Sequence, residues 1–481
     1  MKWESFKSIL LVVLVISSLG LTRTYMLESA SRIDLTASKV IEVPSTNIEL
    51  SEIIHPQGLY INFGGDSHTA FFFNSDNIWK EIYTVVLENF SERAAVLVDK
   101  TLWNTVKQER SIQVVFANGL SVNEYFAGDL EEDIIINEIV IPLLSRDFIL
   151  IKTKNSYYKL TAILNGTLEG MVSNIEKSKY VEYKTIEKRF SIYKVLEEND
   201  IDAEKNFTII PVSDIIGVPF YKSEYLVNFY SEELVESFVQ KIFGDNLSFI
   251  KKMTDYDGTE IFMSNYGKKI LSFRTDGSIE YINNLENEKY VSEEDTFSDN
   301  LKVAWGFLKY FEKIDNDLYL TDYEKIDETS YFYFNSLIEN QTVYYNGKTN
   351  GVAVEIHVNK NVVNYYYSNR RTDFEVFDVE MFWDKADSFS GIFDKNFDVI
   401  SENYKEDNNI KNITDTRLYI LQIVNAIEDF DFEYFIDTTS KSTNVIPCWR
   451  VKIGSSVYHF DIYEGILLKI TKEIVDGLEE N

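Results

Sequence analysis

The first 27 residues constrain this chain most, because they decide on which side of a membrane the other residues work. Lys2 and Lys7 precede an uncharged run at 8–22, SILLVVLVISSLGLT, and Arg23 follows it. As an α-helix this run spans roughly 22 Å, which is shorter than the ~30 Å hydrocarbon core of a bilayer. Length alone therefore leaves open a secretory signal peptide, an uncleaved membrane anchor and a buried soluble helix.

The flanks of this run favour an anchor. No Ala-x-Ala cleavage motif follows, and the best substitute, Ser-Ala-Ser at 29–31, comes directly after an acidic residue. Trp3 and Tyr25 lie where interfacial aromatic residues flank a membrane span, and Arg23 can extend its side chain to the interface. We predict a single transmembrane helix within residues 1–27, with a cytoplasmic N-terminus and the bulk of the chain outside the cell membrane.

Composition limits the partners and the compartment. The 481 residues are 45% hydrophobic and 15% aromatic, which is enough for several packed domains. With 78 acidic against 47 basic residues the formal charge is −31, which opposes binding to nucleic acid. The single cysteine, Cys448, excludes an intrachain disulfide and a thiolate-rich metal site. A large exported region without disulfides suits a bacterial cell envelope.

The predicted fold class is α+β, with a single N-terminal transmembrane helix followed by three extracytoplasmic domains. The predicted segments are a cytoplasmic tip and anchor (1–27), a stalk (28–50), an N-terminal α+β domain (51–205), a central domain of two helix-plus-strands units (206–371) and a C-terminal α+β domain (372–481). In the first domain, aromatic runs at 59–63 and 69–73 bracket a Gly-Gly pair and predict a hairpin. The apolar spacing that follows predicts a helix near 79–90.

In the C-terminal half, one helix followed by several short strands recurs three times. The three predicted helices begin at Ser231, Ser298 and Thr414, each with apolar residues on one face. Predicted strands lie at 259–264, 268–274 and 278–282, then at 331–337, 352–358 and 362–367, and last at 448–453, 456–463 and 466–470. Each unit can cover one face of a small antiparallel sheet with its own helix. The acidic tract 372–412 is the predicted linker before the third unit.

Catalytic and ligand-binding motifs are absent in the spacing that their chemistry requires. Asp66, Ser67 and His68 are the residue types of a hydrolytic triad, but three neighbours on a tight turn cannot align in series, so a polar turn is favoured. Asp255-Tyr-Asp257-Gly lacks the glutamate that closes a calcium loop. Neither a glycine-rich phosphate loop nor a nucleophile elbow occurs.

The other candidate residues also favour structural roles. His357 and His459 fall within predicted strands, where a hydrogen-bonded sheet residue is the favoured interpretation. Cys448 begins a strand and has no nearby cation to activate it, so we expect a small buried side chain. The chain is therefore predicted not to be an enzyme and to need no cofactor or metal. The competing hypothesis of an envelope hydrolase requires the Asp66–His68 residues, or His357 and His459, to meet in one pocket.

Both ends of the chain resemble the YycH (WalH) family of Gram-positive bacteria. The start, MKWESFKSILL at 1–11, is similar to that family's short cytoplasmic end running into one membrane helix. The ending at 449–465, WRVKIGSSVYHFDIYEG, resembles PepSY-type domains, so the 372–481 domain is expected to be PepSY-like. The resemblance implies an anchor followed by three extracytoplasmic domains, the last two similar to the related protein YycI.

The resemblance also implies a role. Together with a YycI-like protein, members of this family bind and modulate the WalK-type sensor histidine kinase that controls cell-wall metabolism, largely through membrane helices, and they offer no catalytic residues. Ser17, Ser18 and Gly20 are the small side chains within the Leu/Val/Ile run, where helix pairs in lipid can pack closely. We predict them as partner-helix contacts, although small residues are also tolerated in spans that contact nothing. The alternative functions are an envelope binding protein, secreted or anchored, and a PepSY-like peptidase inhibitor.

The anchor hypothesis makes a direct prediction about the native N-terminus. Protein isolated from membranes is expected to retain residue 1 and the full mass of 56.0 kDa. Intact-mass analysis after membrane fractionation measures this. A soluble product that begins just after residue 31 would show that the segment is a cleaved signal peptide.

Overall fold

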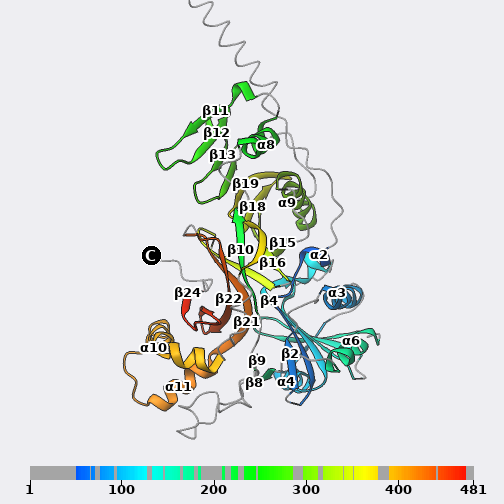
Figure 1. The fold of residues 1–481 in the computed structure, drawn as a ribbon. Helices are drawn as coiled ribbons and strands as arrows, with labels where there is room; N and C mark the ends of the chain where they lie inside the picture. The colour runs from blue at the N-terminus through cyan, green and yellow to red at the C-terminus, as the bar shows by residue number, and fades with distance from the viewer. Residues whose placement is uncertain are drawn as a thin grey trace, which may run out of the picture.

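The computed structural model describes the chain between residue 50 and residue 472 (Figure 1). The described residues are 50–472 without 66, 71–75, 91–94, 127–132, 145–146, 163–165, 178–182, 186–208, 212–217, 226–231, 245–246, 285–295, 313–317, 340, 350, 378–388 and 440–441. The predicted anchor at 1–27 and the predicted stalk at 28–50, apart from its last residue, thus lie outside the described residues. Within the described part of the chain, no helix is long and apolar enough to cross a bilayer. The fold there is a mixture of helices and sheets in which sheet predominates.

The N-terminal part forms a nine-stranded sheet in which every pairing is antiparallel. Its spatial order is β3-β7-β6-β5-β4-β1-β2-β8-β9. The strands are β1 (Gly58–Gly64), β2 (Ser67–Ala70), β3 (Val96–Val98), β4 (Ser111–Ser121), β5 (Ile135–Pro142), β6 (Phe148–Lys152), β7 (Tyr157–Thr161), β8 (Tyr183–Thr185) and β9 (Ile209–Pro211). β1 and β2 are the predicted hairpin, paired from Tyr60↔Ala70 to Gly64↔Ser67.

Helices cover both faces of this sheet because its strands carry apolar side chains on both sides. The helices are α2 (Leu50–Ile53), α3 (Asp76–Phe90), α4 (Lys100–Lys107), α5 (Val122–Tyr125) and α6 (Thr167–Glu176). α3 and α6 belong to the main core, where Ile82 and Val172 are fully buried with Ile61. α4 covers the opposite face, where Trp103 packs with Val140 in a separate cluster.

The remaining strands form one continuous fifteen-stranded sheet. They are β10 (Phe220–Tyr225), β11 (Lys251–Thr254), β12 (Glu260–Ser264), β13 (Lys269–Phe273), β14 (Ile279–Asn283), β15 (Leu318–Ile326), β16 (Thr329–Ile338), β17 (Gln341–Asn346), β18 (Val354–Asn359), β19 (Val362–Ser368), β20 (Arg371–Phe377), β21 (Ile427–Asp437), β22 (Asn444–Ile453), β23 (Ser456–Asp461) and β24 (Leu467–Lys472). The helices with it are α8 (Glu232–Phe243), α9 (Phe297–Phe311), α10 (Phe389–Asp407) and α11 (Thr416–Asn425), with short 3₁₀ turns at Leu247–Phe249 and Asn265–Gly267. The expected recurrence of a helix followed by strands is present, but the expectation of separate small sheets is wrong.

The first two units merge because β14 pairs with β19. The merged part, β11-β12-β13-β14-β19-β18-β16 with β15 beside β16, is called the central sheet below. α8 and α9 lie on the same side of it (Figure 1). The ring of Phe238 on α8 lies 4.6 Å from Phe311 on α9, and Phe307 on α9 stacks 5.9 Å from Tyr281 on β14. The two helices therefore share one core with both halves of the sheet.

The chain leaves the central sheet at a buried corner between β19 and β20. There Arg370 lies 3.4 Å from the carboxylate of Glu312, just after α9, and both side chains are almost fully buried. Tyr366 donates a hydrogen bond to the same carboxylate. The neighbouring guanidinium of Arg371 stacks 3.5 Å from the ring of Tyr225 on β10. These contacts hold the chain where β19 ends and β20 begins. The strands of the large sheet outside the central sheet, β10, β17 and β20 to β24, are called the lower strands below.

The lower strands are held by β21, which pairs in parallel with β17 and antiparallel with β22. β22 continues to β23 and β24, the predicted three-stranded meander, while β10 pairs with both β20 and β22. The predicted linker at 372–412 is wrong, because β20 and the 19-residue helix α10 occupy most of it. Among its acidic residues, α10 buries Ile392, Phe393 and Ile400.

The predicted helix starts lie within two residues of the observed ones, and the capping residues account for the differences. Thr296, two residues before Ser298, caps α9 by accepting a hydrogen bond from the Asp299 backbone. Asp415, rather than Thr414, caps α11 and accepts from two backbone N–H groups. Ser231 lies outside the described residues, directly before α8.

Contacts between the two sheets are few and specific. Ile54 forms a parallel bridge with Leu320 on β15, and the hydroxyl of Tyr60 donates to the Phe430 carbonyl at 3.0 Å. The domain boundaries at 205 and 371 remain a prediction. Strand pairing places β9 in the first sheet and β10 beside the C-terminal strands.

Candidate functional site: the helix-free face of the central sheet

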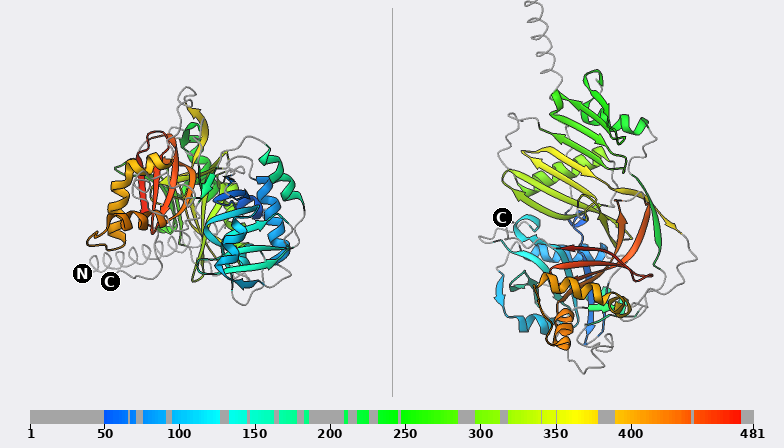
Figure 2. Two further views of the ribbon diagram at one scale, coloured as in Figure 1. Left: turned by 90° about the horizontal axis from the view of Figure 1, so that it is seen from below. Right: turned by 90° about the vertical axis from the view of Figure 1, so that its left-hand side faces the viewer.

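One face of the central sheet carries no described helix, and Figure 2 (right) looks onto this side. Cross-strand register places two rows of side chains on it. The first row is Met253, Ile261, Ser272, Glu280, Tyr367, Glu355, Tyr333 and Asp322. The second row is Lys251, Met263, Ile270, Ile282, Tyr365, His357, Tyr331 and Glu324. These two rows are called the helix-free face below.

Alternation in the strand sequences produces this face. In β16, Phe332 and Phe334 are fully buried against α9, while Tyr331 and Tyr333 between them point to the other side and stay half-buried. In β14, Ile279 and Tyr281 are buried, and Glu280 and Ile282 alternate with them. Phenylalanine thus faces the helices, and tyrosine with its polar hydroxyl faces outward.

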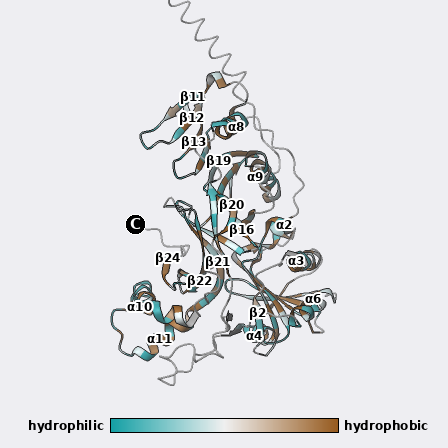
Figure 3. Ribbon diagram, in the orientation of Figure 1, coloured by the Kyte–Doolittle hydropathy of each residue, from teal (hydrophilic) through white to brown (hydrophobic). Residues whose placement is uncertain are grey.

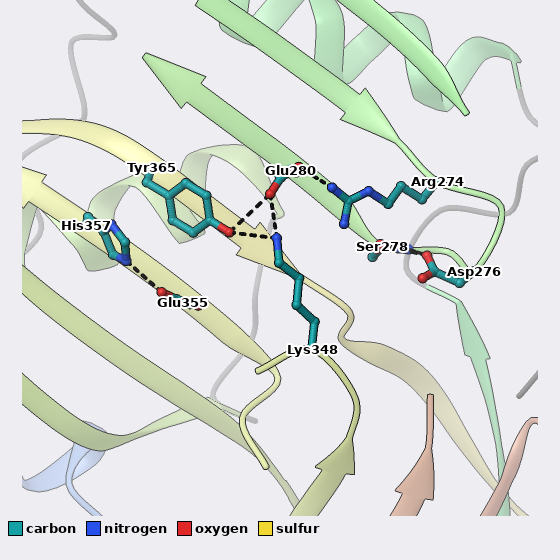
Figure 4. Close-up of polar contacts among 8 residues, drawn as sticks. All are labelled: Arg274, Asp276, Ser278, Glu280, Lys348, Glu355, His357 and Tyr365. Atoms are coloured by element: carbon teal, nitrogen blue, oxygen red, sulfur yellow. Dashed lines mark hydrogen bonds and ion pairs between the residues drawn. The ribbon is translucent and has the colours of Figure 1, made fainter. Parts of the chain in front are cut away.

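Glu280 is the centre of a polar cluster on this face (Figure 4). Its carboxylate accepts hydrogen bonds from Arg274, from Lys348 at 2.7 Å and from the Tyr365 hydroxyl at 3.2 Å. The ammonium of Lys348 also lies 4.7 Å from the ring centroid of Tyr367. The cluster joins the hairpin of β13 and β14 to β19 and to the turn after β17.

His357, on β18, forms the second polar element of this face and lies next to Tyr365 (Figure 4). Its Nε2 atom lies 2.7 Å from the Glu355 carboxylate. Its ring lies between Tyr331 and Tyr365, with centroids 4.2 and 4.5 Å away. This confirms the interpretation of His357 as a hydrogen-bonded sheet residue.

This face combines apolar and polar side chains. Half-buried Ile and Met side chains lie on its β12–β14 part and Tyr rings on its β16–β19 part, and Glu280 and His357 each have a charged partner. Among the described residues, no group of three or more His, Cys, Asp or Glu side chains could hold a metal ion.

Of the residues in the hydrolase hypothesis, the described His68, His357 and His459 lie in separate surroundings. His68 contacts Asn62 at 2.6 Å on the first sheet, and Asp66 lies outside the described residues. His459, on β23, lies 2.7 Å from Glu433 and 4.2 Å from the ring of Tyr344, so its surroundings share no residue with those of His357.

Two further sequence predictions concern a turn and the cysteine. Residues 255–258 form a plain turn, with the Gly258 N–H donating to the Asp255 carbonyl. Cys448 is fully buried, and burial raises the pKa of its thiol, as expected for a packing residue. The predicted helix contacts Ser17, Ser18 and Gly20 lie outside the described residues, and they stay a prediction.

Comparison with known proteins supports a fold assignment. No family model matches the sequence, and no curated protein matches it. Among solved structures, YycH from Bacillus subtilis matches with a TM-score of 0.53 and 10% identity, over 87% of this chain and 98% of that one. An uncharacterised protein from Eubacterium rectale (TM-score 0.30, 12% identity, 56% of this chain and 92% of that one) and the YpeB C-terminal domain of Bacillus megaterium (0.25, 12%, 50% and 97%) are too distant to support any conclusion.

The chain therefore has a YycH-like fold. The predicted resemblance to YycH is confirmed at the level of the fold, across most of the chain.

Sequence reasoning missed most of the helix-free face. Glu280, Lys348 and the tyrosines of β16 and β19 were not singled out, and β11, β15 and β17 were not predicted as strands. A signal was nevertheless present, since Tyr and Phe alternate through the stretch 331–334. Tyr and Phe differ by one hydroxyl, so their alternation indicates a strand with one face in the core and the other toward solvent.

Asp322, at the β15 end of the first row, gives a prediction about stability and pH. Burial raises the pKa of its carboxyl to about 6 in the folded protein, compared with about 3.9 for an unfolded chain. The folded protein then binds more protons than the unfolded chain between these values, so stability falls as the pH rises through that window. Asp322→Asn is expected to increase the free energy of unfolding at pH 7 by up to about 3 kcal/mol and to flatten its pH dependence between 4 and 6.

Urea unfolding from pH 4 to pH 7 measures this effect. Glu375→Gln is the control, because Glu375 is an exposed carboxylate on a different strand, β20. If Asp322→Asn changes the pH dependence no more than the control does, the carboxyl of Asp322 does not have the environment described.

Proposed function

We propose that this chain is a membrane-anchored extracytoplasmic protein that modulates a WalK-type sensor histidine kinase of cell-wall metabolism. The observation that carries this proposal is the YycH-like fold over 87% of the chain. The family-like start of the sequence supports it, since a short basic tip leads directly into an apolar run. The proposed location is the cell membrane, with a single span, a cytoplasmic N-terminus and the described residues outside.

A role without catalysis is consistent with the chemistry of the ectodomain. The candidate histidines have separate surroundings, and each has a carboxylate partner. The helix-free face offers apolar side chains beside a polar cluster, and protein interfaces combine both kinds of side chain. We propose this face as the ectodomain contact for the kinase or for a YycI-like protein.

The membrane segment is proposed to supply the second contact. Ser17, Ser18 and Gly20 would let a partner helix approach closely, because association in lipid depends on packing rather than on the hydrophobic effect. Two separate contacts, one in the membrane and one outside, would hold the partner at high effective concentration. The protein would thus act by positioning the kinase.

Co-purification of the kinase with the full-length chain tests this proposal. Scrambling residues 8–22 keeps the composition of the span but changes its packing face, and Ile282→Arg places a charge in the helix-free face. Each change is expected to reduce the retained kinase roughly tenfold, in line with loss of a central interface contact. Both changes are also expected to alter kinase output in cells.

Val399→Arg is the control, because Val399 is 42% exposed on α10 and lies away from the helix-free face. It should leave kinase retention unchanged. Kinase output that is the same after deletion of the gene or scrambling of residues 8–22 would contradict the proposed function.

A further inference from the structure

One end of the central sheet differs in charge from the rest of the chain. It is formed by residues 247–252, 262–270 and 281–284, which meet where β11 and β13 begin and β12 and β14 end. These residues include four lysines and no aspartate or glutamate, although about one residue in six of the whole chain is acidic. They are called the lysine-rich end below, and β11 to β13 lie at the top of Figure 1, far from α10 and α11.

Two of the four lysines are available to a partner. Lys269 is buried and donates to the Ile242 carbonyl, and Lys252 is paired with Glu260 at 2.8 Å. Lys251 and Lys268 are exposed, and neither side chain has an ion-pair or hydrogen-bond partner among the described residues. A negatively charged surface would therefore meet two ammonium groups that no described residue pairs at this end.

A tyrosine projects beside these lysines. Tyr266 is 96% exposed and makes no ring contact with any described residue. It sits in the tight turn between β12 and β13, where Asn265, Tyr266 and Gly267 all have left-handed backbone conformations, with φ of 51°, 57° and 83°. Such a conformation is unfavourable for tyrosine, so the local hydrogen bond from Lys268 N–H to the Asn265 carbonyl and the strand register must hold it there.

We propose that the lysine-rich end rests on the anionic phospholipid headgroups of the membrane that anchors the chain. Lysines near an anionic lipid surface are attracted to it, and tyrosine prefers the boundary between headgroups and water. The strongly acidic remainder of the ectodomain would be repelled from the same surface. The lysine-rich end and the helix-free face share only the end of the second row, at Lys251, Met263, Ile270 and Ile282. Contact through the lysine-rich end would leave the rest of the helix-free face upright beside the bilayer and accessible to another membrane protein. The inference rests on the membrane anchoring in the proposed function.

The length of the stalk permits this orientation. The 22 residues at 28–49 can extend to about 75 Å at most, since a residue adds at most roughly 3.3–3.6 Å. The first described residue, Leu50, begins α2, which lies midway along the molecule in Figure 1. The stalk therefore does not determine which end of the described structure faces the bilayer. In this proposal, surface charge determines it.

A fluorescent label at the tip tests the contact in the full-length chain. Tyr266→Cys and, as the matched control, Tyr256→Cys are each labelled with the environment-sensitive dye NBD, because Tyr256 is 99% exposed in the turn at the opposite end of β12. The native Cys448 is fully buried and should not react in the folded protein. The labelled proteins are reconstituted in vesicles of phosphatidylcholine with or without phosphatidylglycerol, and flotation reports whether the chain is anchored.

We expect a blue-shifted emission and quenching by headgroup-attached quenchers for the label at 266 in phosphatidylglycerol vesicles. The signal should be several-fold weaker in pure phosphatidylcholine and at position 256. Lys251→Gln combined with Lys268→Gln should reduce the quenching at 266 at least fivefold, because each lysine contributes about that factor to the population at an anionic surface.

The possible failures are distinguishable. Protein that floats with the vesicles but gives equal signals at 266 and 256, or a signal at 266 that is independent of phosphatidylglycerol, overturns this inference and leaves the proposed function standing. Protein that does not float overturns the anchoring, and the inference falls with it.

Discussion

The pairing of β14 with β19 is the contact on which the rest of the structure depends. It aligns Ile279 with Ser368 and Ile282 with Tyr365, residues that are more than 80 positions apart in the sequence. On one side of this ladder Tyr281 and Tyr366 pack against Phe307 of α9, with ring centroids 5.9 and 5.3 Å away. On the other side, the same register brings Glu280 to the Tyr365 hydroxyl. One set of strand contacts therefore builds both the core and the outer polar cluster.

This arrangement explains why the central sheet has an uncovered face. Two helices, α8 and α9, are enough to cover one side of the merged sheet, and the lower strands are covered by helices of their own. The uncovered side is kept soluble by tyrosine hydroxyls and by the ion pairs of Glu280. Its apolar remainder is the reason why we propose this side as a surface for a protein partner.

Local features could be predicted from the sequence, whereas distant pairings could not. Turn residues such as Asp276-Gly277 fixed the β13–β14 hairpin, and apolar spacing placed α9 within two residues. The β14–β19 and β17–β21 pairings depend on complementary surfaces of non-adjacent strands, which no local pattern encodes. α10 was missed because its buried Ile392, Phe393 and Ile400 are scattered among charged residues. The hydrogen-bonded sheet role of His357 and the burial of Cys448 were predicted correctly. The tyrosine face was not foreseen, and the membrane contacts Ser17, Ser18 and Gly20 are still a prediction.

Hydrogen exchange in a Phe307→Ala variant tests most directly whether β14 and β19 form one cooperative sheet. Removal of this buried ring should cost about 3–5 kcal/mol, while Tyr310→Ala, on the same helix but 37% exposed, should cost far less. Mass spectrometry of peptides covering 269–283 and 362–368 should then show faster exchange in both segments. The free energy of opening should fall by the same amount in each. Faster exchange in 362–368 with unchanged protection in 269–283 would contradict the account, because the two units would then open independently.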